Sequence, residues 1–251
     1  MANCSILRRR YGGCAGVFRM MLSPGNRSLY TDALTPPAGF SLDTAVAATF
    51  SMDLNTLLSV PLQLVLQSTE NRDELMKDPI TLYEALQRAS RRVHVFTQQG
   101  RIQAPRQSHL LYSLLESMIT EVRAPNGGAF HPKLWLLRFA EDQGSTSAYR
   151  LMLPSKNLTA DRSWDVALTL DGIAGDKPTK NGAAIADFVG RLPGLAVNGF
   201  SRSSEFDLLL DELSRVDWEL PEGFDELTFY SLGFGGRKWQ PEKNSRLAVI
   251  S

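Results

Sequence analysis

The chain has 251 residues, and its 27 Lys and Arg balance its 27 Asp and Glu, so the formal net charge is zero. Its 43% hydrophobic and 22% charged residues indicate a globular protein with a buried core and exclude global disorder. The neutral balance also excludes a protein that holds nucleic acid by bulk positive charge, so any such site has to be local. No apolar run approaches the ~18 residues of a membrane span, and we expect no membrane partner.

The N-terminal part of the chain carries little pattern, and we expect a loose arm over residues 1–38. Cys4 and Cys14 lie in this arm, and two cysteines cannot form a disulfide framework. We expect both to be reduced thiols in a cytoplasmic protein. The basic start lacks the apolar segment of a secretion signal, because Arg19 interrupts it.

The next stretch predicts one strand and one helix. Residues 44–51 form a short apolar, β-leaning run that is typical of a buried strand. Asp53 is the expected N-cap of the helix that follows. Pro61 would kink or split that helix. A polar loop is expected over residues 71–79.

Three more elements lead to the middle of the chain. Thr81 is the expected cap of a helix whose apolar residues share one face. Residues 92–97 alternate apolar and polar side chains and predict a second strand. Ser108 is the expected cap of a strong helix over 110–119, because the apolar residues there follow the i, i+3, i+4 spacing.

The second half of the chain is richer in strands. A turn at 125–128 precedes a third strand over 129–139, and a polar loop leads to a fourth over 149–154. A fifth strand is expected over 163–172. Two further helices are expected over 181–192 and 204–216. This order of elements predicts an α/β fold with a mixed sheet flanked by helices.

We divide the chain into the arm, an α/β domain over residues 39–200 and a C-terminal segment over 201–251. Nine acids and one Arg lie between Glu205 and Glu226, which predicts a solvated face directed away from any phosphate site. The β-branched apolar run at 246–251 predicts a strand. We interpret it as the start of a second half of the fold.

His131 and Lys133 are the first candidates for chemistry. Alternate residues of a strand share a face, so both side chains are expected to point the same way. An imidazole can act as a nucleophile or a proton donor, and an ammonium can hold a phosphate oxygen. The alternative is an ordinary His at a strand start, beside a Lys whose stem covers apolar surface.

Ser155 and Asn157 follow the fourth strand, where loop residues build sites in α/β sheets. Their hydroxyl and amide can donate hydrogen bonds to the same phosphate oxygens, although such residues also form ordinary turns. Asp165 lies eight residues beyond Asn157 among apolar neighbours and needs a partner. It could accept a hydrogen bond from the His131 ring, or it could be an exposed strand end.

Together, the His-x-Lys, the Ser-x-Asn and the downstream acid resemble the signature of the phospholipase D superfamily over residues 130–172. The segment from Ser155 to Asp165 is most similar to phospholipase D-like proteins of bacterial restriction and defence systems. Two positions depart from the family pattern. The family pattern has an acid five residues after the Lys, and that position is Arg138 here. The pattern usually has a Gly directly before the Ser, and that position is Pro154 here.

The resemblance implies a phosphodiesterase without metal or other cofactor. Two His-x-Lys motifs share one site in this family: one His attacks the phosphorus to form a phosphohistidine, and the other protonates the leaving oxygen and then activates water. Lys133, Ser155 and Asn157 would stabilise the developing charge. Neither His94 nor His109 is followed by a Lys at the same spacing. The second motif is therefore expected from a homodimer or from a C-terminal half beyond Ser251; otherwise the chain is an inactive half.

The substrate is expected to be a nucleic acid. The stretch from Arg88 to His109 contains five Arg and no acid, which indicates either a solvated surface or a groove for a phosphate backbone. From this stretch we select Arg92, Arg101 and Arg106 as candidate substrate-binding residues. No amphipathic membrane face supports a phospholipid substrate. The first alternative to a nuclease is a half-domain or scaffold without activity that binds nucleic acid or a partner protein, and the second is a phospholipid phosphodiesterase.

Overall fold

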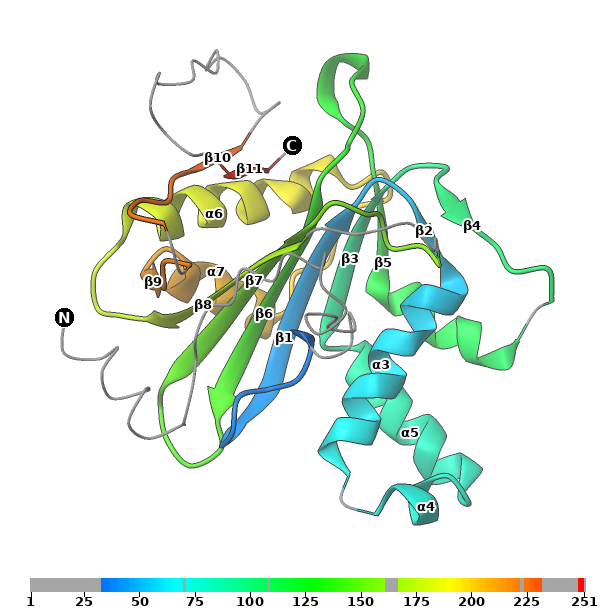
Figure 1. Cartoon of the computed structure of the whole chain (residues 1–251). Helices are drawn as coiled ribbons and strands as arrows, with labels where there is room; N and C mark the ends of the chain where they lie inside the picture. Colours follow the sequence, from blue (N-terminus) through cyan, green and yellow to red (C-terminus); the bar gives the residue numbers. More distant parts are fainter. Residues whose placement is uncertain are drawn as a thin grey trace.

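The computed structural model describes residues 33–69, 71–107, 109–160, 167–221, 224–231 and 248–250. Its centre is a seven-stranded sheet with the order β5-β3-β1-β6-β7-β8-β9 (Figure 1). β1, β3 and β5 are parallel to one another, whereas the strands from β6 to β9 run antiparallel to their neighbours. The strands are β1 (Phe40–Thr49), β3 (Val93–Gln98), β5 (Ile119–Val122), β6 (Lys133–Glu141), β7 (Ser147–Pro154), β8 (Ala167–Ala174) and β9 (Val216–Trp218). The expected mixed α/β fold is confirmed.

Helices cover both faces of this sheet (Figure 1). On one face, Ala45 and Ala47 of β1 pack with α3 (Leu54–Ser68). On the other, Val46 and Ala48 pack with α6 (Lys180–Arg191) and α7 (Ser204–Leu213). Successive strand side chains point to opposite faces, so one apolar strand serves two cores. This is why the run at 44–51 is apolar throughout rather than alternating.

The capping of the first two long helices is local. The Asp53 side chain accepts a hydrogen bond from the Thr56 backbone N at 2.7 Å, as expected for an N-cap. α3 runs past Pro61 without being split. The cap of α5 (Pro79–Ser90) is Asp78 rather than Thr81, whose hydroxyl instead donates to the Asp78 carboxylate.

Four other expectations are corrected in detail. The polar loop at 71–79 contains a short helix, α4 (Arg72–Leu75). The segment expected as an α-helix at 110–119 is a 3-10 helix, η2 (Leu110–Met118), which His109 caps; Ser108 lies outside the described residues. The last helix ends at Leu213, because Val216 already belongs to β9. The third strand begins at Lys133, so His131 precedes it.

The remaining elements are short. The expected C-terminal strand is present as β11 and pairs in parallel with β10. A second small ladder joins β2 to β4, and a short 3-10 helix occupies the predicted turn at 125–128. These elements are β2 (Met52–Asp53), β4 (Ile102–Gln103), η3 (Pro125–Gly127), η4 (Leu192–Leu195), β10 (Phe229–Ser231) and β11 (Ala248–Ile250). Residues 1–32 of the expected arm lie outside the described residues.

Arg138 ties α7 to the sheet. Its guanidinium contacts Glu212 of α7 at 2.9 Å and Asp43 at 2.7 Å, and it donates to the Ser147 hydroxyl at 2.8 Å. The Tyr149 hydroxyl donates to the same Glu212 carboxylate. The acidic run is therefore not solvated throughout, since the Glu212 side chain is only 16% exposed and lies against a cation. α7 and β9, from the 201–251 segment, belong to the same core and sheet as the residues before 200.

Candidate active site

Four chain segments meet at one edge of the sheet, where β1 and β3 end, β6 begins and β7 ends. Thr49, the last residue of β1, pairs with Thr97 on one side and with Lys133 on the other. The Thr49 hydroxyl also accepts a hydrogen bond from the Leu158 backbone N at 3.2 Å. Thr49 therefore brings the His-x-Lys segment and the Ser-x-Asn segment to the same place.

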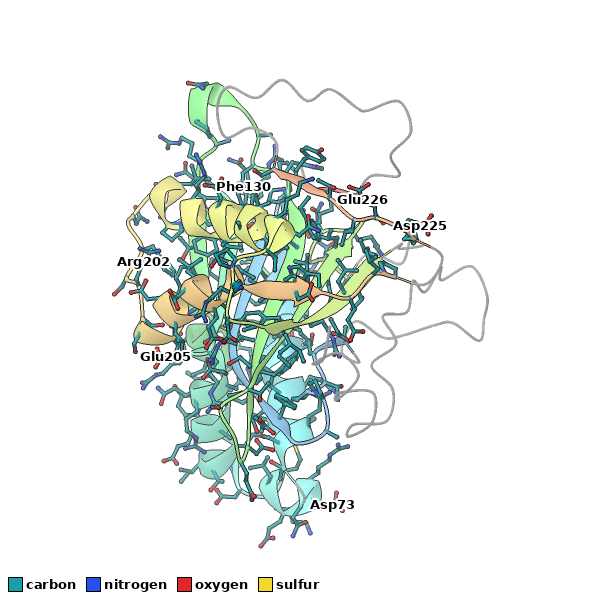
Figure 2. All side chains as sticks on the ribbon, turned by 90° about the vertical axis from the view of Figure 1, so that its left-hand side faces the viewer. Asp73, Phe130, Arg202, Glu205, Asp225 and Glu226 are labelled. Carbon is teal, nitrogen blue, oxygen red and sulfur yellow. The ribbon has the colours of Figure 1, made fainter. Side chains whose placement is uncertain are left out.

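His131 and Lys133 are in direct contact. The Lys133 Nζ lies 3.1 Å from Nδ1 of His131 and 3.4 Å from its Nε2. The two side chains point the same way, as expected, although His131 lies before the first residue of β6. The Phe130 backbone N donates to Oε1 of Gln98 at 2.7 Å, and the Phe130 side chain is buried in the α6 core (Figure 2). These contacts fix the backbone just before His131.

The surroundings favour an uncharged imidazole. Burial lowers the pKa of His131 below its ordinary value, and the positive charge of Lys133 lowers it further. Burial also lowers the pKa of Lys133. An ammonium has donors only, so the imidazole nitrogen facing it accepts. A neutral His131 near pH 7 retains a lone pair for attack on an electrophile or for accepting a proton.

Phe50 is a member of the site that the sequence did not indicate. Its ring centroid lies 4.9 Å from that of His131, in a tilted arrangement. The guanidinium of Arg101 lies over the same ring, 5.0 Å from its centroid. Phe50 thus holds an imidazole and a guanidinium at one place. The available signal was its position directly after the apolar strand, which a single aromatic residue does not distinguish from core packing.

The Ser-x-Asn segment is attached to β2 through its backbone. Leu158 forms a bridge with Met52, and its C=O accepts from the Asp53 backbone N at 3.0 Å. The Ala160 backbone N donates to the Asp53 carboxylate at 2.7 Å. The buried Oδ1 of Asn157 has no hydrogen-bond partner within the described part of the chain. The missing bond at Oδ1 is one that a donor would supply, whereas the oxygens of a phosphodiester only accept, so they would meet the Nδ2 of Asn157 instead.

The structure does not bring every candidate to this edge. Arg92 lies at the other end of β3, where its side chain donates to the Leu42 C=O at 2.8 Å. Five residues of strand separate it from Thr97, which corresponds to about 16 Å. We therefore remove Arg92 from the candidate site. Asp165 lies outside the described residues.

Arg106 lies beside the site rather than in it. It lines a cavity of about 540 Å³ together with residues of the β2, β4 and Ser-x-Asn segments. Arg101 and Arg106 therefore stay candidates for contact with a substrate. Their separation from Arg92 shows that the Arg-rich stretch does not form one surface.

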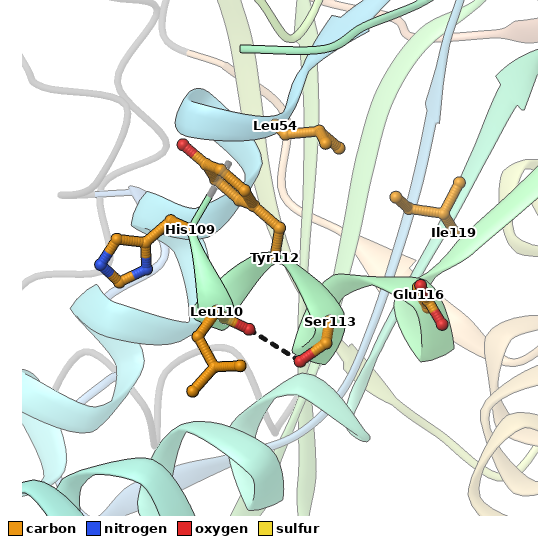
Figure 3. A pocket seen from close by; sticks show the side chains of 7 residues that line it. All are labelled: Leu54, His109, Leu110, Tyr112, Ser113, Glu116 and Ile119. Atoms are coloured by element: carbon orange, nitrogen blue, oxygen red, sulfur yellow. Dashed lines mark hydrogen bonds between the residues drawn. The ribbon is translucent and has the colours of Figure 1, made fainter. Parts of the chain in front are cut away.

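A second cavity, near η2, does not contain a catalytic triad. Its lining includes His109, Ser113 and Glu116 (Figure 3). A Ser, a His and an acid are the residue types of the catalytic triad of serine hydrolases. However, the Ser113 hydroxyl donates to the Leu110 C=O at 2.7 Å, and Nδ1 of His109 accepts from the Leu111 backbone N. Both groups are engaged with the backbone of η2, so the nucleophile–base contact that such chemistry needs is missing.

Among the described residues, no three His, Cys, Asp or Glu side chains lie close enough together to form a metal-binding group. In the same part of the chain, no helix is both long and apolar enough to cross a membrane.

Comparisons with known proteins give a distant structural likeness. No protein-family profile matches the chain, and no curated protein matches it in sequence. The chain is similar in structure to yeast tyrosyl-DNA phosphodiesterase, seen in crystal structures of two of its mutants, with 16% identity and a TM-score of 0.42 in both. The match covers 70% of this chain and 34% and 35% of the two yeast chains. The match therefore spans about a third of the length of the yeast chains.

Proposed function

We propose that the chain is a phospholipase D-like phosphodiesterase that uses His131 as its nucleophile. The observation that supports this most directly is the contact between Lys133 Nζ and His131 Nδ1, at the edge where the segment of Ser155 and Asn157 follows β7. A neutral imidazole and a cation that can hold a phosphate oxygen are the groups that attack on a phosphodiester requires.

The reaction proceeds in two displacements. In the first, an imidazole nitrogen of His131 forms a bond to phosphorus while the bond from phosphorus to the leaving oxygen breaks. A second imidazolium gives its proton to that oxygen. In the second displacement, the imidazole that gave up its proton is neutral and takes a proton from water. The oxygen of that water attacks phosphorus, and the bond from phosphorus to His131 breaks. Lys133, Ser155 and Asn157 stabilise the charge on the phosphoryl oxygens throughout.

The second imidazole comes from another His-x-Lys motif, because His94 and His109 lack the Lys. His94 is also packed between Phe200 and Phe206 in the α7 core, so it cannot reach the edge of the sheet. We propose that a second copy of the chain supplies His131 across a two-fold axis.

Nucleic acid is the substrate to test first. Arg101 and Arg106 place two guanidinium groups beside the site, where they can contact neighbouring phosphates without reading sequence. The Ser-x-Asn segment resembles those of prokaryotic defence proteins, so we assign the chain a nuclease role of that kind and a place in the cytoplasm.

Hydrolysis of bis(p-nitrophenyl) phosphate tests the proposal. We expect activity in the presence of EDTA, since the groups that stabilise charge are side chains, and loss of at least a hundredfold in His131→Ala. His109→Asn is the matched control, because His109 is exposed and Asn can keep the cap of η2. Activity that EDTA abolishes and only a divalent ion restores would contradict the mechanism. An inactive chain that still binds DNA would favour the scaffold instead.

A further inference from the structure

The cavity of about 540 Å³ that Arg106 lines is large enough for a small ligand, since such sites span ~300–1,000 Å³. It lies between the start of α3, the β4 segment and the residues that follow Asn157. Its lining includes Asp53, Asn55, Gln103, Ala104, Arg106 and Thr159.

The cavity adjoins the candidate active site on two sides. Ser51, which also lines the cavity, directly follows Phe50, whose ring packs against His131. Thr159 is two residues after Asn157, and its backbone N donates to the Asn157 C=O at 2.8 Å. A substrate with its phosphate at His131 and Asn157 therefore has one of its two ester groups next to this cavity.

The charges of the lining disfavour a second phosphate inside the cavity. Asp53 carries a negative charge and is already fully engaged: its carboxylate accepts from the Thr56 backbone N, the Thr56 hydroxyl and the Ala160 backbone N, each at 2.7 Å. It would repel an anion from the N-terminus of α3. Among the described residues that line the cavity, Arg106 is the one cation, and because it is exposed it can meet a phosphate at the rim but not neutralise one within.

The uncharged lining groups suit a ligand with both donors and acceptors. The Tyr112 hydroxyl donates to Oδ1 of Asn55, which turns the Asn55 amide so that its Nδ2 remains a donor. Gln103 is exposed and offers a complete amide, and Thr159 offers a hydroxyl. Carboxamides pair with the donor–acceptor edges of nucleobases.

We infer that this cavity binds the nucleoside on one side of the scissile phosphate, with its base hydrogen-bonded by the Asn55 and Gln103 amides. The inference rests on the proposed phosphodiesterase function. It adds to that function a binding site for the nucleoside itself, which a lipid or a simple alcohol ester would leave empty. Arg106 at the rim contacts the next phosphate of the strand.

Two chromogenic esters with the same leaving group test this. The p-nitrophenyl esters of thymidine 5′- and 3′-monophosphate carry a nucleoside, whereas bis(p-nitrophenyl) phosphate carries a second aryl group. We expect the kcat/KM of the wild type to be higher for one of the thymidine esters than for bis(p-nitrophenyl) phosphate, and the ratio of the two values is the preference. Gln103→Ala should lower that preference about fivefold, which corresponds to one neutral hydrogen bond. Ala104→Trp should lower it more, because it fills the cavity. Gln87→Ala, at an exposed Gln of α5, is the control and should leave the preference unchanged.

Binding without turnover separates this inference from the proposed function. Calorimetry should show thymidine monophosphate binding more tightly than deoxyribose 5-phosphate, with the difference reduced in Gln103→Ala. If neither ester is hydrolysed but this difference is seen, the proposed chemistry fails and the nucleoside site stands. Equal binding of the two ligands, no binding of either, or a preference that Gln103→Ala and Ala104→Trp leave intact would each overturn the nucleoside site.

Discussion

Replacing Arg138 tests whether its ion pair with Glu212 holds α7 on the sheet. The Arg138 and Glu212 side chains are 7% and 16% exposed, and Nε of Arg138 lies 2.9 Å from Oε2 of Glu212. Arg138→Met fills a similar volume but leaves the Glu212 carboxylate buried without its cation. Breaking a buried pair in this way costs about 3–5 kcal/mol. In a chain of this length, that corresponds to roughly 6–20 °C in Tm.

Urea unfolding measured by tryptophan fluorescence gives the free energy of unfolding for each variant. Arg191→Met is the matched control: its partner Asp187 is one turn away on α6, both side chains are about half exposed, and such pairs contribute only ~0–1 kcal/mol. Arg138→Asp should be worse than Arg138→Met, because it places a third carboxylate beside Asp43 and Glu212. A loss below about 1 kcal/mol in Arg138→Met, equal to that in the control, would refute the argument.

Three further outcomes are expected. Mixing wild type with His131→Ala should reduce phosphodiesterase activity more steeply than the wild-type fraction if two copies form one site, whereas a linear decrease would indicate independent subunits. Phe50→Leu should lower kcat about threefold to tenfold through the lost ring contacts with His131 and Arg101, and Phe50→Tyr should restore it; equal activity of all three would remove Phe50 as a positioning residue. Burial lowers the pKa of His94, partly opposed by Glu205 at the start of α7 (Figure 2), so the unfolded chain binds a proton that the folded chain does not. The free energy of unfolding should therefore fall as the pH drops below about 6.5, and a His94→Phe variant should flatten that pH dependence.

Local patterns predicted most of the fold. Three features depend only on neighbours in sequence, and the structure contains all of them: the Asp53 cap, the apolar run of β1, and the strands β6 and β7. Errors arose where a short segment could satisfy its backbone in two ways. The Leu110–Met118 segment has helical spacing, but only its Leu114, Leu115 and Met118 are buried. Burial of these three side chains against the core is compatible with a 3-10 helix, so the spacing did not require an α-helix.

The site was predictable only in part, because it depends on the order of strands in the sheet. His131, Lys133 and Asn157 were predicted from their types and spacing, and the structure shows the first two in contact. Arg92 was included because it is close in sequence to Arg101, yet the two lie at opposite ends of β3. Phe50 and Gln98 were missed because nothing in their own neighbourhood marks them. Both reach the site only because β1 and β3 end beside the start of β6.

The same geometry explains how the chain accommodates Arg138 at a position where the signature that it resembles has an acid. Five residues of β6, about 16 Å, separate Arg138 from Lys133, and Arg138 points to the face covered by α7, opposite to its neighbour Leu137. Its partners Asp43, Ser147 and Glu212 come from three other parts of the chain and none of them lies at the edge with His131. The departure therefore concerns how α7 is anchored. The groups that would carry the chemistry are held separately, by Thr49, Phe50 and Gln98.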